Sequence, residues 1–260
     1  MDYNYHTHTS RCRHASGTVE EYILRAIECC VKYMGFSDHF PYICTNGEEA
    51  GFRVPVAEAK DYVAEINALK EKYKDKIDIK IGFEMEYYPD NFETMLKNAQ
   101  SYGAEYLILG PHFIKEEFPG GEHLITATDD EDKLKNYAET IANGIKTGAF
   151  TYVAHPDMFN FTGDETVYCE HIRKIAIASR ECNVPLEINF LGIRDNRIYP
   201  NELFWKIAGE EKAPATFGFD SHDVQNAYDG ASYPKAMELV KKYNINYIGK
   251  PQIIDINKLQ

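Results

Sequence analysis

The sequence alternates short runs rich in β-branched and aromatic residues with segments whose apolar residues recur at helical spacing. Thr18-x-x-Glu21 has the form of a helix capping box, and apolar residues follow it every three or four positions. Strands are expected at 3–6, 33–37, 77–83, 106–109, 151–154, 186–189, 216–219 and 247–248. Further helices are expected near 56–69, 91–101, 130–146 and 165–182. Seven or eight βα units in 260 residues favour a closed parallel α/β barrel over an open sheet.

Histidine and acidic residues stand at the carboxyl ends of nearly all these expected strands. In chain order they are His6, His8, Asp38, His39, Glu84, His112, His155, Asp220 and His222. In a parallel barrel the carboxyl ends of the strands meet on one face, where active sites are built. Residues that are distant in the chain would therefore converge there.

The residue types in this set are those that bind zinc, manganese or iron through nitrogen and oxygen. His6-x-His8 and Asp220-x-His222 suit one ion each, because residues i and i+2 leave a strand on the same side. A single histidine at a strand end is more often a hydrogen-bonded structural residue, so the joint pattern carries the prediction. His123 and His171 fall outside it, and we expect both at the surface.

The charge and hydrophobicity of the chain indicate which kinds of partner it is expected to lack. The formal net charge is −13 and no basic stripe is present, so we expect no nucleic-acid partner. No window approaches the roughly 18 apolar residues that a membrane span requires, and the start lacks the pattern of a signal peptide. Six cysteines without CxxC spacing indicate reduced thiols. We therefore expect a cytoplasmic protein without a membrane partner; the sequence does not define its oligomeric state.

Six short motifs, taken together, resemble the polymerase and histidinol phosphatase (PHP) family. They are His6-Thr7-His8, Ser37-Asp38-His39, Gly82-Phe83-Glu84, Pro111-His112, Ala154-His155-Pro156 and Asp220-Ser221-His222. The resemblance implies a distorted, TIM-like (β/α)7 barrel that forms a single metallohydrolase domain over residues 1–260. It also implies a centre of three divalent ions, which could be zinc, iron or manganese.

The resemblance further implies how the ligands are shared. One ion would be held by His6, His8, Glu84 and Asp220, and a second by Glu84, His112 and His155. The third would be held by His14, His39 and His222, with His14 placed by its spacing after His6. Glu84 would bridge two ions, and Asp38 would orient a histidine.

Within the family, the chain resembles the histidinol-phosphate phosphatase branch. The run from Leu186 to Asn189, followed by Gly192-Ile193-Arg194 and Tyr199-Pro200, is similar to the substrate loop of that branch. Either Arg194 or Arg197 could bind the phosphate of L-histidinol phosphate, with Tyr199 nearby. Asp157, Glu116 and Glu117 are candidates for recognising the substrate's cationic groups.

As a hypothesis for the mechanism, we expect a hydroxide that bridges two metal ions to attack phosphorus. Glu84 and Asp220 would hold the ions, and Arg194 or Arg197 would contact the phosphoryl oxygens. No general acid for the leaving group is assigned. Alternatives are a phosphatase for another small monoester or a nucleotide, and a metal-binding protein without catalysis. An amidohydrolase is disfavoured, because no metal-bridging lysine follows a middle strand.

Overall fold

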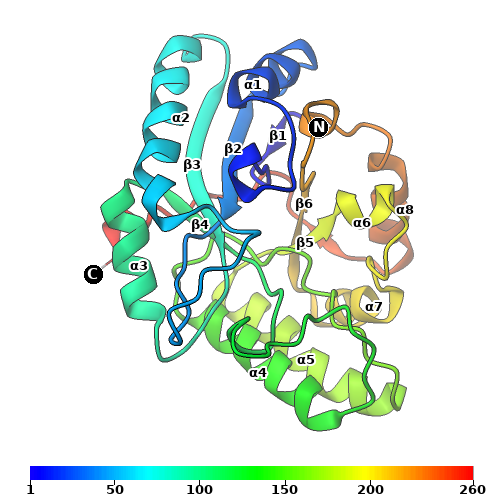
Figure 1. Cartoon of the computed structure of the whole chain (residues 1–260). Coiled ribbons are helices and arrows are strands. Elements are labelled where there is room, and N and C mark those ends of the chain that lie inside the picture. The colour runs from blue at the N-terminus through cyan, green and yellow to red at the C-terminus, as the bar shows by residue number, and fades with distance from the viewer. Residues whose placement is uncertain (260) are drawn as a thin grey trace.

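The strands of the computed structural model, which describes residues 1–259, form two parallel sheets at the centre of the molecule (Figure 1). The first sheet contains β1 (Tyr3–Asn4), β2 (Tyr33–His39), β3 (Asp78–Met85) and β4 (Tyr106–Leu109), in chain order. The second contains β5 (Leu186–Asn189), β6 (Pro214–Gly218) and β7 (Asn246–Tyr247). Seven of the eight expected strands are therefore present, and no strand end differs from its expected position by more than two residues.

Isolated bridges join the two sheets into a curled, TIM-like barrel. Val153 pairs in parallel with both Leu109 and Leu186, which connects β4 to β5. On the other side Thr7 pairs with Ser221, which connects the end of β1 to the segment after β6. The expected strand at 151–154 is reduced to these bridges at Val153, with bends in the backbone at Thr151 and Ala154.

Helices pack around the outside of the strands (Figure 1). Those that the apolar spacing predicts are α1 (Val19–Glu28), α2 (Ala59–Tyr73), α3 (Phe92–Tyr102), α4 (Glu131–Lys146) and α5 (Glu165–Cys182). The capping box at Thr18 and Glu21 is confirmed. The expected helix at 56–69 begins with a short 3-10 helix, η2 (Val56–Glu58), which runs directly into α2. Outside the predicted segments lie α6 (Phe190–Arg194), α7 (Glu202–Glu211) and α8 (Tyr233–Lys242), and the 3-10 helices η1 (Ser10–Cys12), η3 (Val224–Ala227) and η4 (Ile256–Lys258). Among residues 1–259, no helix combines the length and apolar character that crossing a membrane requires.

Tyrosine rings fill part of the barrel interior. Tyr3, Tyr5, Tyr106 and Tyr152 belong to one buried cluster, and the Tyr106 hydroxyl donates to the carbonyl of Tyr5 at 2.8 Å. Gly35 and Gly82 leave room for Tyr106, since a Cβ at either position would lie within 2.5 Å of it. Close packing of this kind holds the strands in a single register.

Candidate metal centre

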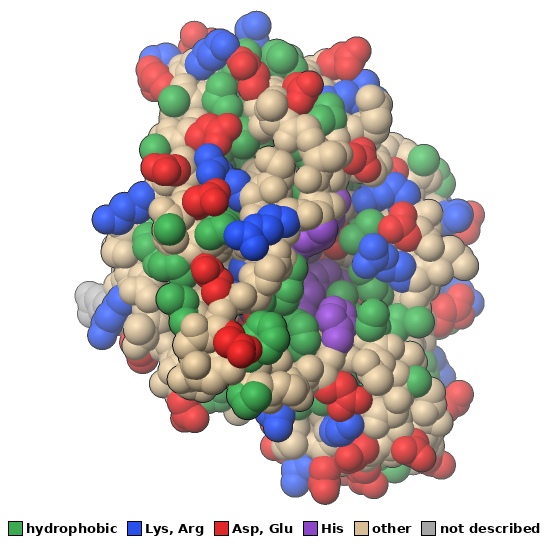
Figure 2. Space-filling model, in the orientation of Figure 1, with side chains coloured by type: hydrophobic (Ala, Val, Ile, Leu, Met, Phe, Trp, Pro, Cys, Tyr) green, Lys and Arg blue, Asp and Glu red, His purple; other side chains and the backbone are tan. Residues whose placement is uncertain are grey.

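A cavity of about 590 Å³ opens at the carboxyl ends of the strands. Figure 2 shows histidine side chains at the bottom of a hollow on this face. The polar residues that line it include His8, His14, His39, Glu84, His112, His155, Asp220 and His222. His6 lies fully buried beneath them. The nine residues that the sequence singles out as metal ligands are thus brought together.

The carboxylate of Glu84 lies at the centre of this group and faces histidines on two sides. Its Oε2 atom is 3.5 Å from Nε2 of His6, 3.5 Å from Nε2 of His8 and 3.2 Å from Nδ1 of His39. Its Oε1 atom is 2.8 Å from Nε2 of His155 and 3.4 Å from Nε2 of His112. Parallel pairing of β2 with β3 sets His39 directly opposite Glu84 and explains part of this convergence. One carboxylate is thereby divided between two groups of imidazoles.

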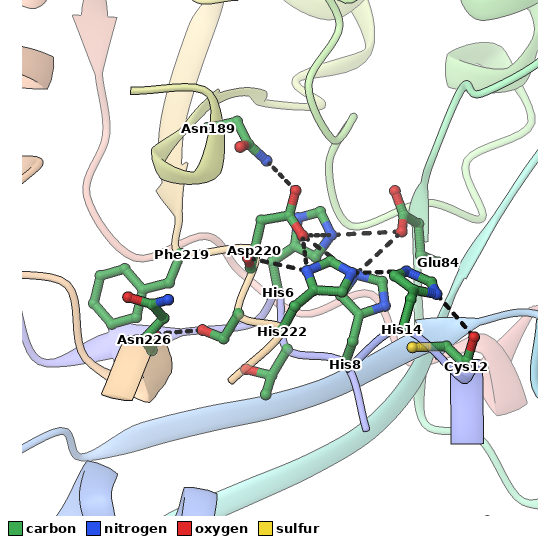
Figure 3. A network of polar contacts seen from close by, with 12 residues as sticks. His6, His8, Cys12, His14, Glu84, Asn189, Phe219, Asp220, His222 and Asn226 are labelled. Carbon is green, nitrogen blue, oxygen red and sulfur yellow. Dashed lines mark hydrogen bonds and ion pairs between the residues drawn. The ribbon is translucent and has the colours of Figure 1, made fainter. Parts of the chain in front are cut away.

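Asp220 completes the first of these groups from the opposite side of the barrel (Figure 3). Its Oδ1 atom is 3.6 Å from Nε2 of His6, 3.4 Å from Nε2 of His8 and 3.3 Å from Nδ1 of His222. Its Oδ2 atom accepts a hydrogen bond from Nδ2 of Asn189 at 3.0 Å. The Nε2 atoms of His14 and His222 face each other at 3.0 Å.

These donors fit divalent metal ions. Seven buried atoms of the candidate ligands lack a hydrogen-bond partner: Nε2 of His6 and His8, Nδ1 of His39 and His155, both carboxylate oxygens of Glu84 and Oδ1 of Asp220. Ligands held tetrahedrally at about 2.0–2.1 Å from zinc are about 3.4 Å apart, close to most of the separations around Glu84 and Asp220. Buried polar atoms without partners are costly, and a cation among them removes that cost.

Three-donor groups can be drawn through the cluster in several ways. They include His6-His8-Glu84, His14-His39-His222, His39-Glu84-His112 and His6-His155-Asp220. The first two lie within the first and third ligand sets implied by the family resemblance. The third group combines Glu84 and His112 with His39, whereas the family resemblance combines the same two residues with His155. The division of ligands between the ions therefore stays a prediction. Cys12 also lies within reach of His8 and His222.

The surrounding histidines lower the pKa of Glu84 and the pKa of Asp220. Burial alone would raise the pKa of Glu84, but the imidazoles of His112, His6 and His39 outweigh it and keep that pKa well below the usual range. Burial opposes the same effect at Asp220, where His6, His222 and His8 prevail. Both side chains are therefore anionic and suited to bind cations.

Further polar groups orient the imidazoles from behind. Nδ1 of His6 lies 2.8 Å from Oε1 of Glu187, and Nδ1 of His112 lies 2.8 Å from Oε1 of Glu86. Nδ1 of His8 lies 3.4 Å from Oδ1 of Asp38, as the sequence predicts. Because a carboxylate only accepts, each contact places the proton on Nδ1 and leaves Nε2 free to bind a metal. Sequence reasoning did not identify the roles of Glu86 and Glu187. The available signal for Glu86 was its position two residues after Glu84, and the signal for Glu187 was an acidic residue inside an otherwise apolar strand.

Two of the candidate ligands have left-handed backbone conformations. His155 has φ of 30° and Asp220 has φ of 48°, a region that residues other than glycine rarely adopt. Strained residues of this kind cluster at functional sites, where surrounding contacts hold them. Here Glu187 accepts from the backbone N–H of His155 at 3.0 Å.

The two arginines of the predicted substrate loop have different surroundings. Arg194 is engaged by the protein: Nη1 donates to Asp229 at 2.8 Å and to the carbonyl of Phe219 at 3.1 Å, and Nη2 donates to the carbonyl of Asp220 at 3.1 Å. Arg197 makes weaker contacts, to the Tyr199 hydroxyl and to Asp195, both at 3.2 Å. Both arginines and Tyr199 line the cavity. Arg13 also lines it, although the sequence indicates no role for that residue.

The three acidic residues suggested for cation recognition do not line the cavity. Oδ2 of Asp157 accepts from the backbone N–H of Asn201 and from Nε1 of Trp205, each at 2.7 Å, and burial raises the pKa of Asp157 to about 7. Glu116 accepts from Thr45, and Glu117 is paired with buried Arg53. Contacts within the protein therefore hold all three carboxylates.

The two histidines expected at the surface are placed differently. His171 is a buried residue of α5 and only 6% exposed, so its prediction is wrong; its Nε2 atom lies 3.8 Å from Oε1 of Glu131 at the start of α4. His123 is half-buried and lines the cavity beside Phe113, with their ring centroids 5.1 Å apart. Its insertion folds back over the site, which the sequence pattern does not indicate.

A TIM-like barrel with a cluster of histidines and carboxylates at the carboxyl ends of its strands defines a metal-dependent hydrolase. Residues 4–190 match the model of the PHP domain, and the chain therefore belongs to the PHP family. Arg194, Arg197, Asp220 and His222 lie beyond the matched residues.

Relatives of the chain carry a consistent name. This chain is 27% identical to the histidinol-phosphatase of Lactococcus lactis, and the match covers 93% of this chain and 90% of that protein. It is 26% identical to the histidinol-phosphatase of Bacillus subtilis, covering 86% and 96%. A crystal structure of the Lactococcus lactis histidinol phosphate phosphatase with zinc, L-histidinol and phosphate superposes with a TM-score of 0.72 at 21% identity, covering 100% of this chain and 98% of that one. At that identity the superposition establishes the shared fold.

Proposed function

We propose that this chain hydrolyses L-histidinol phosphate to L-histidinol and phosphate, a step of histidine biosynthesis. The observation that carries the proposal is the position of Glu84, whose two oxygens face separate groups of histidines at the bottom of an open cavity. The names of the relatives support the choice of substrate, because two proteins that this chain matches over most of their length are histidinol-phosphatases.

We further propose a centre of three divalent ions, which zinc, iron or manganese would suit. His6, His8, Glu84 and Asp220 would hold one, Glu84, His112 and His155 a second, and His14, His39 and His222 the third. When bound, such ions neutralise phosphate charge and lower the pKa of a coordinated water. Against two ligand carboxylates, three divalent ions leave about +4 at the site, which favours a phosphate dianion despite the acidic chain.

The residues of the chain divide the remaining work. Arg197 lines the cavity with weak protein contacts, so its guanidinium is the one suited to bind phosphoryl oxygens by paired hydrogen bonds. Tyr199 supports Arg197 through its hydroxyl. Arg194 holds the backbone carbonyl of Asp220 and so positions that ligand.

The experiment that tests this function is a substrate panel with metal-quantified protein. Phosphate release from L-histidinol phosphate is compared with release from nucleotides and p-nitrophenyl phosphate. We expect kcat/KM for L-histidinol phosphate to exceed the others by at least about a hundredfold, which corresponds to about 3 kcal/mol of differential binding in the transition state. Equal values across the panel would indicate a phosphatase of another small monoester or nucleotide.

We also propose that residues 1–260 act as a single domain in the cytoplasm. All six cysteines are free, including Cys12 and Cys44, which are buried. Free thiols are typical of a reducing compartment.

A further inference from the structure

We infer that Arg53 is a positioning residue for the metal centre: through Glu86 it fixes the imidazole of His112, and through Glu117 it ties two loops together as one wall of the cavity. The inference rests on the proposed metal-binding role of His112. It concerns a buried network outside the ligands themselves.

Arg53 lies in the segment between β2 and η2 and is 1% exposed. Its Nη1 atom is 2.7 Å from Oε2 of Glu86, and its Nε atom donates to Oε1 of Glu117 at 2.5 Å. Nη1 also donates to the carbonyl of Phe40 at 3.2 Å. A planar guanidinium with several N–H groups can bond both carboxylates at once, which a lysine ammonium does less well.

Glu86 carries the effect of Arg53 to the metal centre. One carboxylate oxygen of Glu86 contacts Arg53, and the other lies 2.8 Å from Nδ1 of His112. Nε2 of His112 in turn faces Oε1 of Glu84 at 3.4 Å. A buried chain of contacts thus runs from Arg53 to the carboxylate at the centre of the site. Such partners fix ligand orientation and contribute to metal affinity.

The same guanidinium joins two loops that are distant in the sequence. Glu117 lies in the loop between β4 and α4, and its other carboxylate oxygen accepts from the Tyr88 hydroxyl at 3.1 Å. Because both acidic partners of Arg53 are buried, loss of the arginine would leave two carboxylates without a cation. Among residues 1–259, the side chains that contact Glu86 and Glu117 include one permanent positive charge, the guanidinium of Arg53.

The wall that these loops form is aromatic. Phe52 lines the cavity directly beside Arg53, whose guanidinium carbon lies 5.0 Å from the centroid of the Phe52 ring. Phe52 stacks on Phe113 at 5.9 Å and meets the ring of His39 edge-on at 5.3 Å. Displacement of the Arg53 guanidinium would therefore disturb two things: the contact of Glu86 with His112, and the position of the Phe52 ring that lines the cavity.

Metal affinity measured on folded variants tests this inference. Arg53→Lys and Glu86→Gln are compared with Arg173→Lys, because Arg173 also bridges two glutamates, Glu210 and Glu211, but on the surface. Each apoprotein is titrated with Zn²⁺ against a competing chelator, and thermal unfolding identifies the temperature range in which the variant is folded.

We expect Arg53→Lys and Glu86→Gln to bind at least one zinc ion about 10–100-fold more weakly while folded, and Arg173→Lys to match the unchanged protein. A lower melting temperature with unchanged zinc affinity in both variants would overturn the inference and leave Arg53 a purely structural residue. If Arg53→Lys does not fold, Glu86→Gln tests the step through which Arg53 would act on His112 while it keeps the Arg53–Glu117 pair, and unchanged zinc affinity in that variant would overturn the inference. The titration uses no phosphoester, so failure of L-histidinol phosphate as substrate would be a separate result.

Discussion

Nδ1 of His6 lies 2.8 Å from Oε1 of Glu187, and both side chains are completely buried. The other carboxylate oxygen of Glu187 accepts from the backbone N–H of His155 at 3.0 Å and from Nδ2 of Asn189 at 2.8 Å. One residue of β5 therefore orients two candidate ligands that enter the site from opposite parts of the chain. Asn189 extends the contact to Asp220.

Glu187→Gln should weaken metal binding without removing a ligand. The amide cannot offer a charged acceptor to His6, so that imidazole becomes a poorer ligand, and we expect about 10–100-fold losses in metal affinity or kcat. Chelator competition and steady-state kinetics measure the two effects. Glu139→Gln, a partly exposed position paired with Lys174, is the control. Affinity and kcat equal to those of the control would show that Glu187 does not tune the ligand.

Glu84→Ala should remove the carboxylate that both groups of histidines share. We expect kcat to fall by a factor on the order of 10³ or more, because the charge at the reacting centre is no longer arranged for the transition state. Metal content, determined on the same preparation, should also fall. Near-normal turnover in metal-replete Glu84→Ala protein would contradict a bridging role.

Arg197→Met and Arg194→Met should have separable effects. Loss of Arg197 should raise KM for the phosphate ester by about tenfold or more with little change in the melting temperature, since the residue is partly exposed and weakly held. Each variant serves as the other's control, by steady-state kinetics and thermal unfolding.

Loss of Arg194 should instead destabilise the fold by roughly 2–4 kcal/mol, because buried Asp229 loses its cation. A raised KM for Arg194→Met with an unchanged melting temperature would reverse the assignment of the two arginines.

Asp157→Asn should leave KM for the substrate unchanged. The carboxylate of Asp157 bonds Asn201 and Trp205 inside the protein and does not line the cavity, and an asparagine carbonyl can accept the same two hydrogen bonds. Kinetics on L-histidinol phosphate check this. A tenfold rise in KM would show that Asp157 reaches the substrate in the bound state.

The positions of the candidate ligands were accessible to sequence reasoning because the alternation of strands with helices is a strong pattern. His39 and Glu84 each end a strand, and parallel pairing sets them side by side without any detail of packing. His155 was placed correctly although its strand is reduced to bridges at Val153, since the chain still enters the barrel at that point.

Contacts that depend on the path of loops were not accessible. Asp157 follows His155 by two positions, yet its carboxylate is held by Trp205 on α7, a helix that lies outside the segments expected from apolar spacing. Glu86 and Glu187 are acidic residues in buried strands, and only the three-dimensional distances show that each faces the Nδ1 atom of a histidine.

The central claim is that ions held by Glu84 and its surrounding histidines are required for hydrolysis of a phosphate monoester. The most direct test strips the protein with a chelator, quantifies the remaining metal and follows phosphate release from L-histidinol phosphate as zinc, iron or manganese is returned. We expect activity to vanish with the metal and to recover in proportion to the ions bound, saturating near three per chain. Full turnover in metal-free protein, or metal-saturated protein with no phosphatase activity, would contradict the account.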